Sequence, residues 1–206
     1  HGRMCLDLWA GEGIDTSAVG IHQDAHTGVY FVRHDDMGHH FSYLRKGSAA
    51  SRMQASDLSN KLIGSAKYLH VSGISQAIST SARETVSAAI AMAREAGVRV
   101  SYDPNLRLAL WSLEEAKSAI LSTIALTDEF LPGLDELALV SGKATPEELV
   151  AWAHSQGAKV VVLKMGVQGV LVSDGGSIEK VSSAKVNAVD ATGAGGRPEV
   201  HQHHLA

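Results

Sequence analysis

The sequence is poor in the features that mark several specialised classes of protein. It holds one cysteine, Cys5, so a disulfide within the chain is excluded and a reducing compartment such as the cytoplasm is favoured. No apolar run has the length of a membrane span, and the first residues show no basic stretch followed by an apolar one. We therefore expect a cytoplasmic protein without a transmembrane helix or a secretory signal.

Positive charge is also in short supply. The 18 Lys and Arg are outnumbered by 22 Asp and Glu, which gives a formal net charge of -4. Such a chain has no long-range attraction to nucleic acid or to an anionic membrane surface, so neither is an expected partner. Hydrophobic residues make up 45% of the 206 residues, which is enough for one globular domain with a substantial core.

What the sequence does contain is an alternation of apolar strands and amphipathic helices. Capping boxes that begin at Ser112 and Thr145 mark two of the helix starts. Strands that are apolar throughout and alternate with helices are typical of a mostly parallel α/β sheet with helices on both faces. The predicted strands span 67–73, 98–102, 126–131 and 159–164, and the predicted helices span 77–96, 112–125 and 145–157.

Two β-hairpins flank this alternation. The first joins 27–33 to 39–45 and is predicted to form a flap over a site, and the second joins 169–173 to 177–181. Ligands bind parallel sheets where the strands end. The loops to inspect are therefore those after Gly73, Tyr102, Leu131 and Lys164.

Residues 190–195 (Asp-Ala-Thr-Gly-Ala-Gly) form the most informative segment. The small residues allow successive backbone N–H groups to turn toward an anion, and a helix after them would add its dipole. A glycine-rich turn in front of an irregular tail explains the same residues equally well.

Two arginines and two tyrosines are further candidates. Arg107 follows a predicted strand, and Arg45 ends the first hairpin. A guanidinium offers a fixed fork of donors to a carboxylate or phosphate, although a single Arg is more often a solvated surface residue. Tyr30 and Tyr43 lie on opposite arms of the same hairpin, where cross-strand packing is the simpler role.

The loop after the fourth predicted strand holds Lys164, Gly166 and Gly169. A lysine there suits phosphate and the glycines suit a close backbone approach, but a plain tight turn fits as well. Glu136 suits water-bound Mg²⁺, or it complements the dipole of a helix start. The 11 histidines form no His-Glu-x-x-His pattern, so we expect no histidine metal site.

Three motifs together carry a family resemblance. They are Asp-x-Thr-Gly-Ala-Gly at 190–195, Tyr-x-Arg-x-x-Ser-Ala-Ala-Ser at 43–51 and Asp-Pro-Asn-x-Arg at 103–107. With further stretches at 12–17, 27–31, 69–74, 131–136 and 161–169, they resemble the ribokinase-like (PfkB) carbohydrate kinases in order from about Gly2 to Gly195. The second and third motifs are similar to the 2-keto-3-deoxygluconate branch of that family.

The resemblance implies a fold and a reaction. The fold is a Rossmann-like α/β domain, here a partial one over 1–196, with a small β lid at about 27–45 and incomplete at both termini. The reaction moves the γ-phosphate of ATP onto a sugar hydroxyl with Mg²⁺. The implied partners are therefore a sugar acid and ATP, and a homo-oligomer or another partner chain is expected because an incomplete sheet exposes apolar surface.

The resemblance also implies roles for single residues. Sugar contacts are expected from Tyr30, Tyr43, Arg45 and Arg107, and two guanidinium groups suit the carboxylate of a sugar acid. The implied anion hole is Gly193, Ala194 and Gly195, where charge on the transferring phosphoryl group would be stabilised. Nucleotide contacts are expected at Lys164, Gly166 and Gly169, water-mediated Mg²⁺ binding at Glu136, and a monovalent cation near Asp190.

One departure from the family pattern concerns the catalytic base. The family signature continues with an Asp that takes the proton of the sugar hydroxyl, and here that position is Gly196, which cannot accept a proton. Residues 197–206 form an aperiodic tail outside the pattern. We therefore expect weak or no turnover. A non-catalytic sugar-acid-binding remnant and a kinase of a neutral sugar such as fructose or ribose remain as alternatives.

Overall fold

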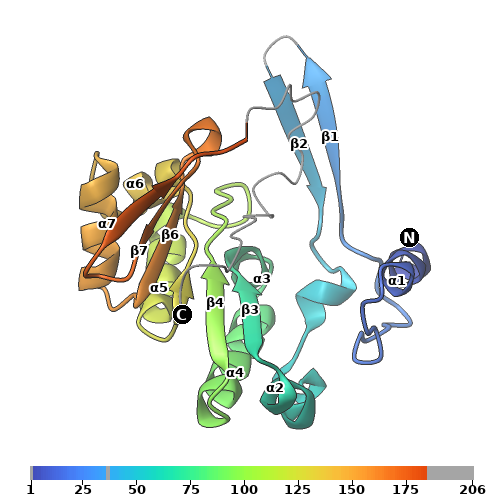
Figure 1. Cartoon of the computed structure of the whole chain (residues 1–206). Coiled ribbons are helices and arrows are strands. Elements are labelled where there is room, and N and C mark those ends of the chain that lie inside the picture. Colours follow the sequence, from blue (N-terminus) through green and yellow to red (C-terminus); the bar gives the residue numbers. More distant parts are fainter. Residues whose placement is uncertain (1, 36–37, 185–206) are drawn as a thin grey trace.

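The computed structural model describes residues 2–35 and 38–184, and a six-stranded sheet forms its centre (Figure 1). The strand order is β3-β4-β5-β6-β7-β8; the first four strands are parallel and the last two are antiparallel. The mostly parallel sheet predicted from the sequence is thus confirmed. The strands are β3 (Tyr68–Ser72), β4 (Arg99–Asp103), β5 (Glu129–Phe130), β6 (Val160–Lys164), β7 (Val170–Ser173) and β8 (Ile178–Val181).

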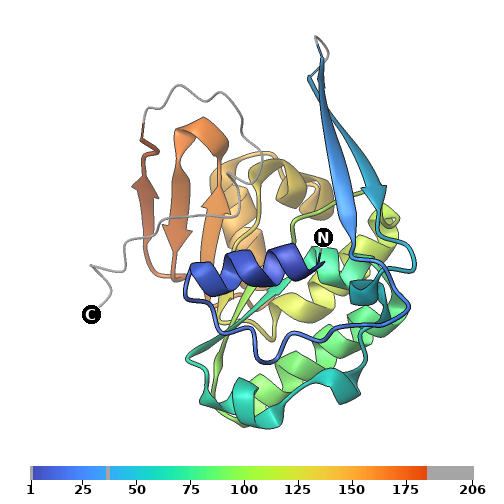
Figure 2. The same cartoon turned by 90° about the vertical axis from the view of Figure 1, so that its right-hand side faces the viewer.

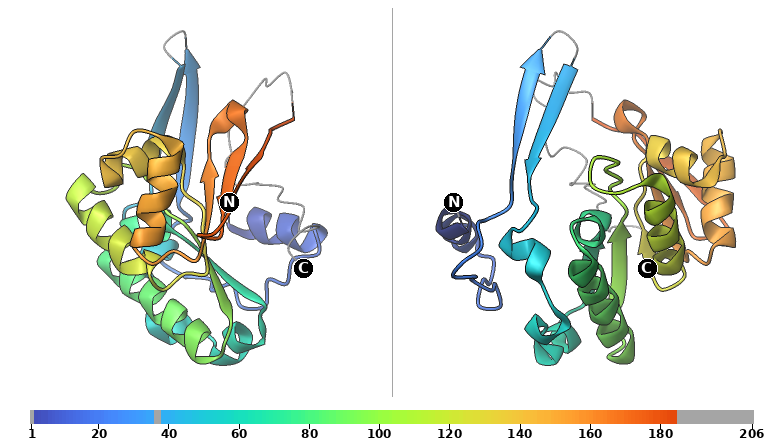
Figure 3. Two further views of the ribbon diagram at one scale, coloured as in Figure 1. Left: turned by 60° about the vertical axis from the view of Figure 1, so that its left-hand side comes forward. Right: turned by 180° about the vertical axis from the view of Figure 1, so that it is seen from behind.

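Five helices share one hydrophobic core with one face of this sheet (Figure 3). They are α3 (Gly73–Ala77), α4 (Thr80–Glu95), α5 (Leu113–Ile124), α6 (Leu134–Ser141) and α7 (Pro146–Ser155). Val100 and Tyr102 of β4 are fully buried in that core. Because side chains alternate along a strand, Ser101 and Asp103 face the other way.

The opposite face differs from the expectation of helices on both faces. Within 2–35 and 38–184 no helix packs there, and α1 (Gly2–Gly11) lies beyond the β3 edge with none of its residues buried (Figure 2). Polar side chains occupy part of that face, since His70 Nδ1 lies 3.2 Å from Ser101 Oγ. No helix in the described part of the chain is long and apolar enough to cross a membrane.

Hydroxyl caps set the helix boundaries. Ser112 and Thr145 form the predicted capping boxes at the starts of α5 and α7. The predicted helix over 77–96 begins later, at Thr80, because Ser79 takes an extended conformation and its side chain accepts a hydrogen bond from the N–H of Ala82. A separate short helix, α3, precedes this break and ends at Ala77. The apolar spacing continues across this break, so periodicity alone did not reveal it.

Both predicted hairpins are present. Strands β1 (Val29–Asp35) and β2 (Gly38–Leu44) form a separate antiparallel sheet in which Tyr30 pairs with Tyr43. This hairpin rises past the edge at which β3 and β4 end (Figure 1). Below it, the 3-10 turns η1 (Ala49–Arg52) and η2 (Ala55–Asp57) and the short helix α2 (Asn60–Ser65) contact α4. The second hairpin is β7–β8.

Candidate functional site

The carboxyl edge of the sheet gathers four charged side chains. Asp103 ends β4, Arg107 lies in the loop that follows, Glu136 lies in the first turn of α6 and Lys164 ends β6. Lys164 Nζ is 2.7 Å from Asp103 Oδ2, and Arg107 Nη1 is 3.7 Å from Glu136 Oε1. The fold thus brings together three residues that the sequence proposed as site residues, and adds Asp103.

The loop that carries Arg107 has an unusual backbone. Asn105 has φ +38°, a left-handed conformation that costs energy for most residues and that Asn tolerates better than most. The N–H of Asn105 donates to Asp103 Oδ1 at 3.0 Å. A Cβ atom built on Gly73 would overlap the carbonyl oxygen of Pro104, so the loop is pressed against the start of α3.

Arg107 itself is only loosely held. Its Nη1 donates to the carbonyl of Leu106 at 2.9 Å, and the 3.7 Å separation from Glu136 is too long for a hydrogen bond. The side chain is 42% exposed. A guanidinium in this state keeps donors available for an anion that enters from solvent.

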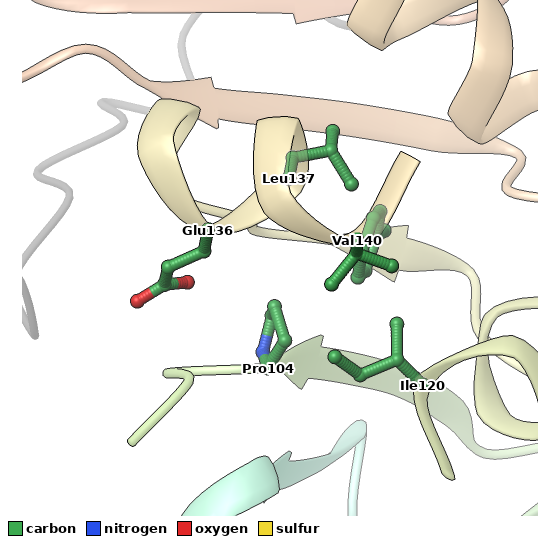
Figure 4. Close-up of a pocket in the computed structure, with 6 residues that line it drawn as sticks. Pro104, Ile120, Glu136, Leu137 and Val140 are labelled. Carbon is green, nitrogen blue, oxygen red and sulfur yellow. The ribbon is translucent and has the colours of Figure 1, made fainter. Parts of the chain in front are cut away.

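Glu136 is a partly buried carboxylate at a helix start, with 22% of its side chain exposed. Burial, chiefly, raises its pKa, and the negative charge of Asp103 adds to the effect, while the N–H of Gly133, Lys164 and Arg107 oppose it. Figure 4 shows its carboxylate directed away from Leu137 and Val140. The hollow beside it is lined by apolar side chains and is too small to hold a ligand.

Lys164 does not present a free ammonium group. The ion pair with Asp103 is largely buried, with 19% and 13% of the two side chains exposed. The backbone N–H of Lys164 donates to the carbonyl of Pro132 at 2.8 Å, and Lys164 forms a parallel bridge with Gly133. Any contact of this ammonium with phosphate would have to be shared with Asp103.

Local backbone structure explains why glycine stands at two positions after Lys164. Gly166 and Gly169 have positive φ angles of 57° and 89°, and residues 166–168 form a 3-10 turn. A Cβ atom on Gly169 would overlap the carbonyl oxygen of Val181 on the neighbouring strand. The tight-turn interpretation is therefore sufficient for these residues, and a nucleotide contact at them stays a prediction.

A second cluster lies on the hairpin. The rings of Tyr30 and Tyr43 are 6.3 Å apart, and the guanidinium carbon of Arg45 lies 5.8 and 5.6 Å from their centroids. The Nε of Arg45 is buried and has no hydrogen-bond partner among the described residues. Buried guanidinium donors are costly to leave unsatisfied, so this cluster is incomplete without an acceptor.

The other predicted site residues lie outside the described residues. They are Asp190, Gly193, Ala194, Gly195 and Gly196, together with the tail over 197–206.

Comparison with known proteins decides the family. Residues 1–195 match the pfkB family of carbohydrate kinases. The chain belongs to this family. It is 35% identical over 204 residues to a 2-dehydro-3-deoxygluconokinase of Thermoproteus tenax and 33% identical over 199 residues to a probable fructokinase of Arabidopsis thaliana. It covers 60% and 58% of their lengths, and 94% of this chain is aligned in each case.

Solved structures of the family confirm the fold. The chain superposes on a PfkB protein of Polaromonas sp. JS666 with a TM-score of 0.85, 35% identity, and 94% and 64% of the two chains covered. A putative ribokinase of E. coli in complex with ATP and Mg²⁺ matches with a TM-score of 0.84 at 27% identity, covering 94% and 62%. The ribokinase-like fold predicted from the sequence is thus confirmed.

The putative ribokinase of E. coli was solved with ATP and Mg²⁺, and Glu136 offers this chain the carboxylate oxygen that Mg²⁺ takes as a ligand. Mg²⁺ keeps several waters and uses one or two carboxylates beside the substrate phosphates, so a dedicated cage is not required. No group of three or more acidic, His or Cys side chains suited to a metal occurs within 2–35 and 38–184. Partial burial raises the pKa of the Glu136 carboxyl, and a nearby cation would favour its charged form.

The sequence left two contributors to this edge unassigned. Asp103 stood inside the Asp-Pro-Asn-x-Arg motif, but only the fold shows that its carboxylate meets Lys164 across 61 positions of sequence. Gly73 ended a predicted strand, and its need for a bare Cα appears only when Pro104 is placed against it. A signal for Asp103 existed, because Asp before Pro and Asn favours a turn held by its side chain.

Proposed function

We propose that this chain contributes the sugar-binding and part of the nucleotide-binding machinery of an ATP-dependent kinase for a sugar acid, with 2-keto-3-deoxygluconate as the substrate. The observation that carries the proposal is the buried Nε of Arg45 beside Tyr30 and Tyr43, which has no hydrogen-bond partner in the described part of the chain. A carboxylate supplies the charged acceptor that such a group requires. The relatives named 2-dehydro-3-deoxygluconokinase support the same choice.

Each cluster has its own part in the proposed reaction. Arg45 and Arg107 bind the carboxylate and orient the sugar, and the tyrosine rings exclude water from it. The sugar hydroxyl oxygen forms a bond to the γ-phosphorus of ATP, the bond to the bridging oxygen breaks, ADP leaves with that electron pair, and the hydroxyl proton passes to solvent water. Glu136 would hold Mg²⁺ through a water molecule, and the metal ion would supply positive charge to the phosphate oxygens.

The proton of the hydroxyl has no carboxylate to receive it at position 196. Glycine stands there, and a glycine side chain has no basic atom. General bases contribute about 10²- to 10⁴-fold, so we propose that this chain turns over far more slowly than its relatives. A sugar-acid-binding protein without turnover is the limiting form of this proposal.

A neutral-sugar kinase is the second candidate. It is favoured by the 32–33% identity to plant fructokinases. A neutral ligand, however, offers no charged acceptor to Arg45 or Arg107, so the buried donor of Arg45 would stay poorly satisfied.

Calorimetry on the 206-residue chain distinguishes the candidates. We expect heat of binding with ketodeoxygluconate and none with fructose or ribose at equal concentration. Arg45→Met is expected to abolish that heat, whereas Arg94→Met is not, because Arg94 donates to the carbonyl of Leu126 away from both clusters. Binding of fructose in place of the sugar acid would overturn the substrate assignment.

A coupled ADP-release assay tests the reaction. With Mg·ATP and ketodeoxygluconate we expect slow turnover or none. A rate equal to that of the family's full-length enzymes would contradict the role given to position 196.

A further inference from the structure

We propose that Asp103 is a positioning residue for Arg107. It holds the loop that carries Arg107, and it neutralises Lys164, so that the two cations have different roles. It lies at the end of β4 and is 9% exposed. Its two carboxylate oxygens bind two different segments: Oδ1 accepts from the N–H of Asn105 at 3.0 Å, and Oδ2 accepts from Lys164 Nζ at 2.7 Å. One side chain therefore connects the loop that carries Arg107 to the strand that leads to the 166–169 turn.

The first bond maintains a strained turn. Asn105 has a φ of +38°, and such a conformation persists only where the surroundings enforce it. Asp103 provides one restraint, and the seating of the Pro104 carbonyl against Gly73 provides the other. Arg107 follows Asn105 by two positions, so the direction of the Arg107 side chain depends on this turn.

The second bond fixes the carboxylate itself. A free Asp side chain rotates between staggered positions, whereas this one is held by Lys164, whose own backbone is bonded to Pro132 and bridged to Gly133. The restraint on Asn105 is therefore transmitted from β6 through Lys164 to Asp103. Removal of the ammonium group should loosen the turn, although Lys164 does not touch it.

Charge balance assigns different roles to the two cations. Lys164 is neutralised at 2.7 Å in a largely buried pair, whereas Arg107 is 3.7 Å from Glu136 and 42% exposed. At this edge an entering carboxylate therefore meets Arg107 as an available cation, whereas Lys164 is already neutralised. This step rests on the proposed function for the identity of the ligand, but the restraint on the turn does not.

The opposite edge of the sheet holds a matched control. Lys159 Nζ is 2.6 Å from Asp128 Oδ1, and Asp128 Oδ2 accepts from the N–H of Val100 at 2.8 Å. This Asp has the same two kinds of partner, but it precedes β5 instead of ending a strand. Changes in this pair should affect stability without affecting the sugar site.

The test uses the 206-residue chain and the variants Asp103→Asn, Lys164→Met, the double variant and Lys164→Arg. Titration calorimetry with ketodeoxygluconate is expected to show about tenfold weaker binding in each single charge-removing variant, a loss of about 1.4 kcal/mol. The double variant should lose no more than either single variant, because both act through one link. Lys164→Arg should bind within about threefold of the parent chain, since it retains the charge.

Amide hydrogen exchange of Asn105, followed by NMR, reports the restraint without any ligand. We expect faster exchange in Lys164→Met, parent-like exchange in Lys164→Arg and no change in Asp128→Asn or Lys159→Met. Unchanged exchange in Lys164→Met, or additive losses in the double variant, would overturn the positioning role. If the parent chain binds no sugar acid, the proposed function fails, and the exchange measurement still decides the role of Asp103.

Discussion

The two ends of the parallel strands, the amino edge and the carboxyl edge of the sheet, carry the same types of charged residue, but their ion pairs differ in length. At the amino edge, Arg99 meets Glu129 at 2.9 Å and Lys159 meets Asp128 at 2.6 Å. At the carboxyl edge, the corresponding separations are 3.7 Å for Arg107–Glu136 and 2.7 Å for Lys164–Asp103.

The difference between the edges lies in what each arginine still lacks. Arg99 donates a hydrogen bond to Glu129 and lies 4.9 Å above the ring of Tyr68, so its partners are all within the chain. Arg107 reaches no carboxylate at hydrogen-bond distance within residues 2–35 and 38–184. Ion pairs that are complete within the chain support the fold, whereas an incomplete pair at the strand ends leaves donors for a ligand.

The largest expected effect is a difference in the free energy of unfolding between alanine variants of two glycines near opposite edges. Gly73→Ala places a Cβ on the carbonyl of Pro104, where backbone has to move, and should lower the free energy of unfolding by about 3 kcal/mol. Gly64→Ala in α2 meets only the Cβ of Ala96 at 3.5 Å and should be neutral or stabilising by about 0.5 kcal/mol. Urea unfolding of both variants measures the contrast, and equal losses would contradict the close approach at Gly73.

The next effect concerns the two arginines. Arg107→Lys removes the planar fork of donors and should weaken binding of ketodeoxygluconate by about tenfold, a loss of about 1.4 kcal/mol. Arg99→Lys makes the same change at the amino edge and should leave the affinity unchanged. Calorimetry on both variants checks this, and similar losses in both would remove the distinction between the edges.

A third effect depends on pH and carries a definite sign. Because the folded chain raises the pKa of Glu136, the wild-type protein loses stability as pH rises from the unfolded value through the folded one. Glu136→Gln escapes this loss and keeps an acceptor for the N–H of Gly133. We expect Glu136→Gln to be more stable than wild type at pH 8 and equal to it at pH 3.5, measured by chemical unfolding.

The smallest expected effect concerns Asp128 at the amino edge, where stability changes with pH in the direction opposite to that for Glu136. Burial opposes ionisation of Asp128, but bonds from Lys159 and from the N–H of Val100 outweigh it and lower its pKa. The resulting stability is present above the unfolded pKa and is lost as pH falls through the folded value. Asp128→Asn should therefore be less stable than wild type at pH 7 by a few tenths of a kcal/mol, and the difference should vanish near pH 2. A difference that persists there would show that packing, and not charge, is responsible.

Local chemistry made much of the fold predictable. The capping boxes at Ser112 and Thr145 and the two hairpins depend on residues within a few positions of each other. Periodicity did not predict the break at Ser79 or the helices α1, α2 and α3. Helix α1 has no buried residue and α2 has six residues, so neither offers a long apolar face for periodicity to detect.

The sequence by itself determined most of the strands and helices, the presence of the two hairpins and the residue types available to bind an acid and a phosphate, because these follow from interactions between near neighbours in the chain. Only the tertiary structure decided which charges meet. Lys164 reaches Asp103 and Arg107 is left short of Glu136 because parallel strands bring their ends to a common edge in an order that the spacing of residues does not encode.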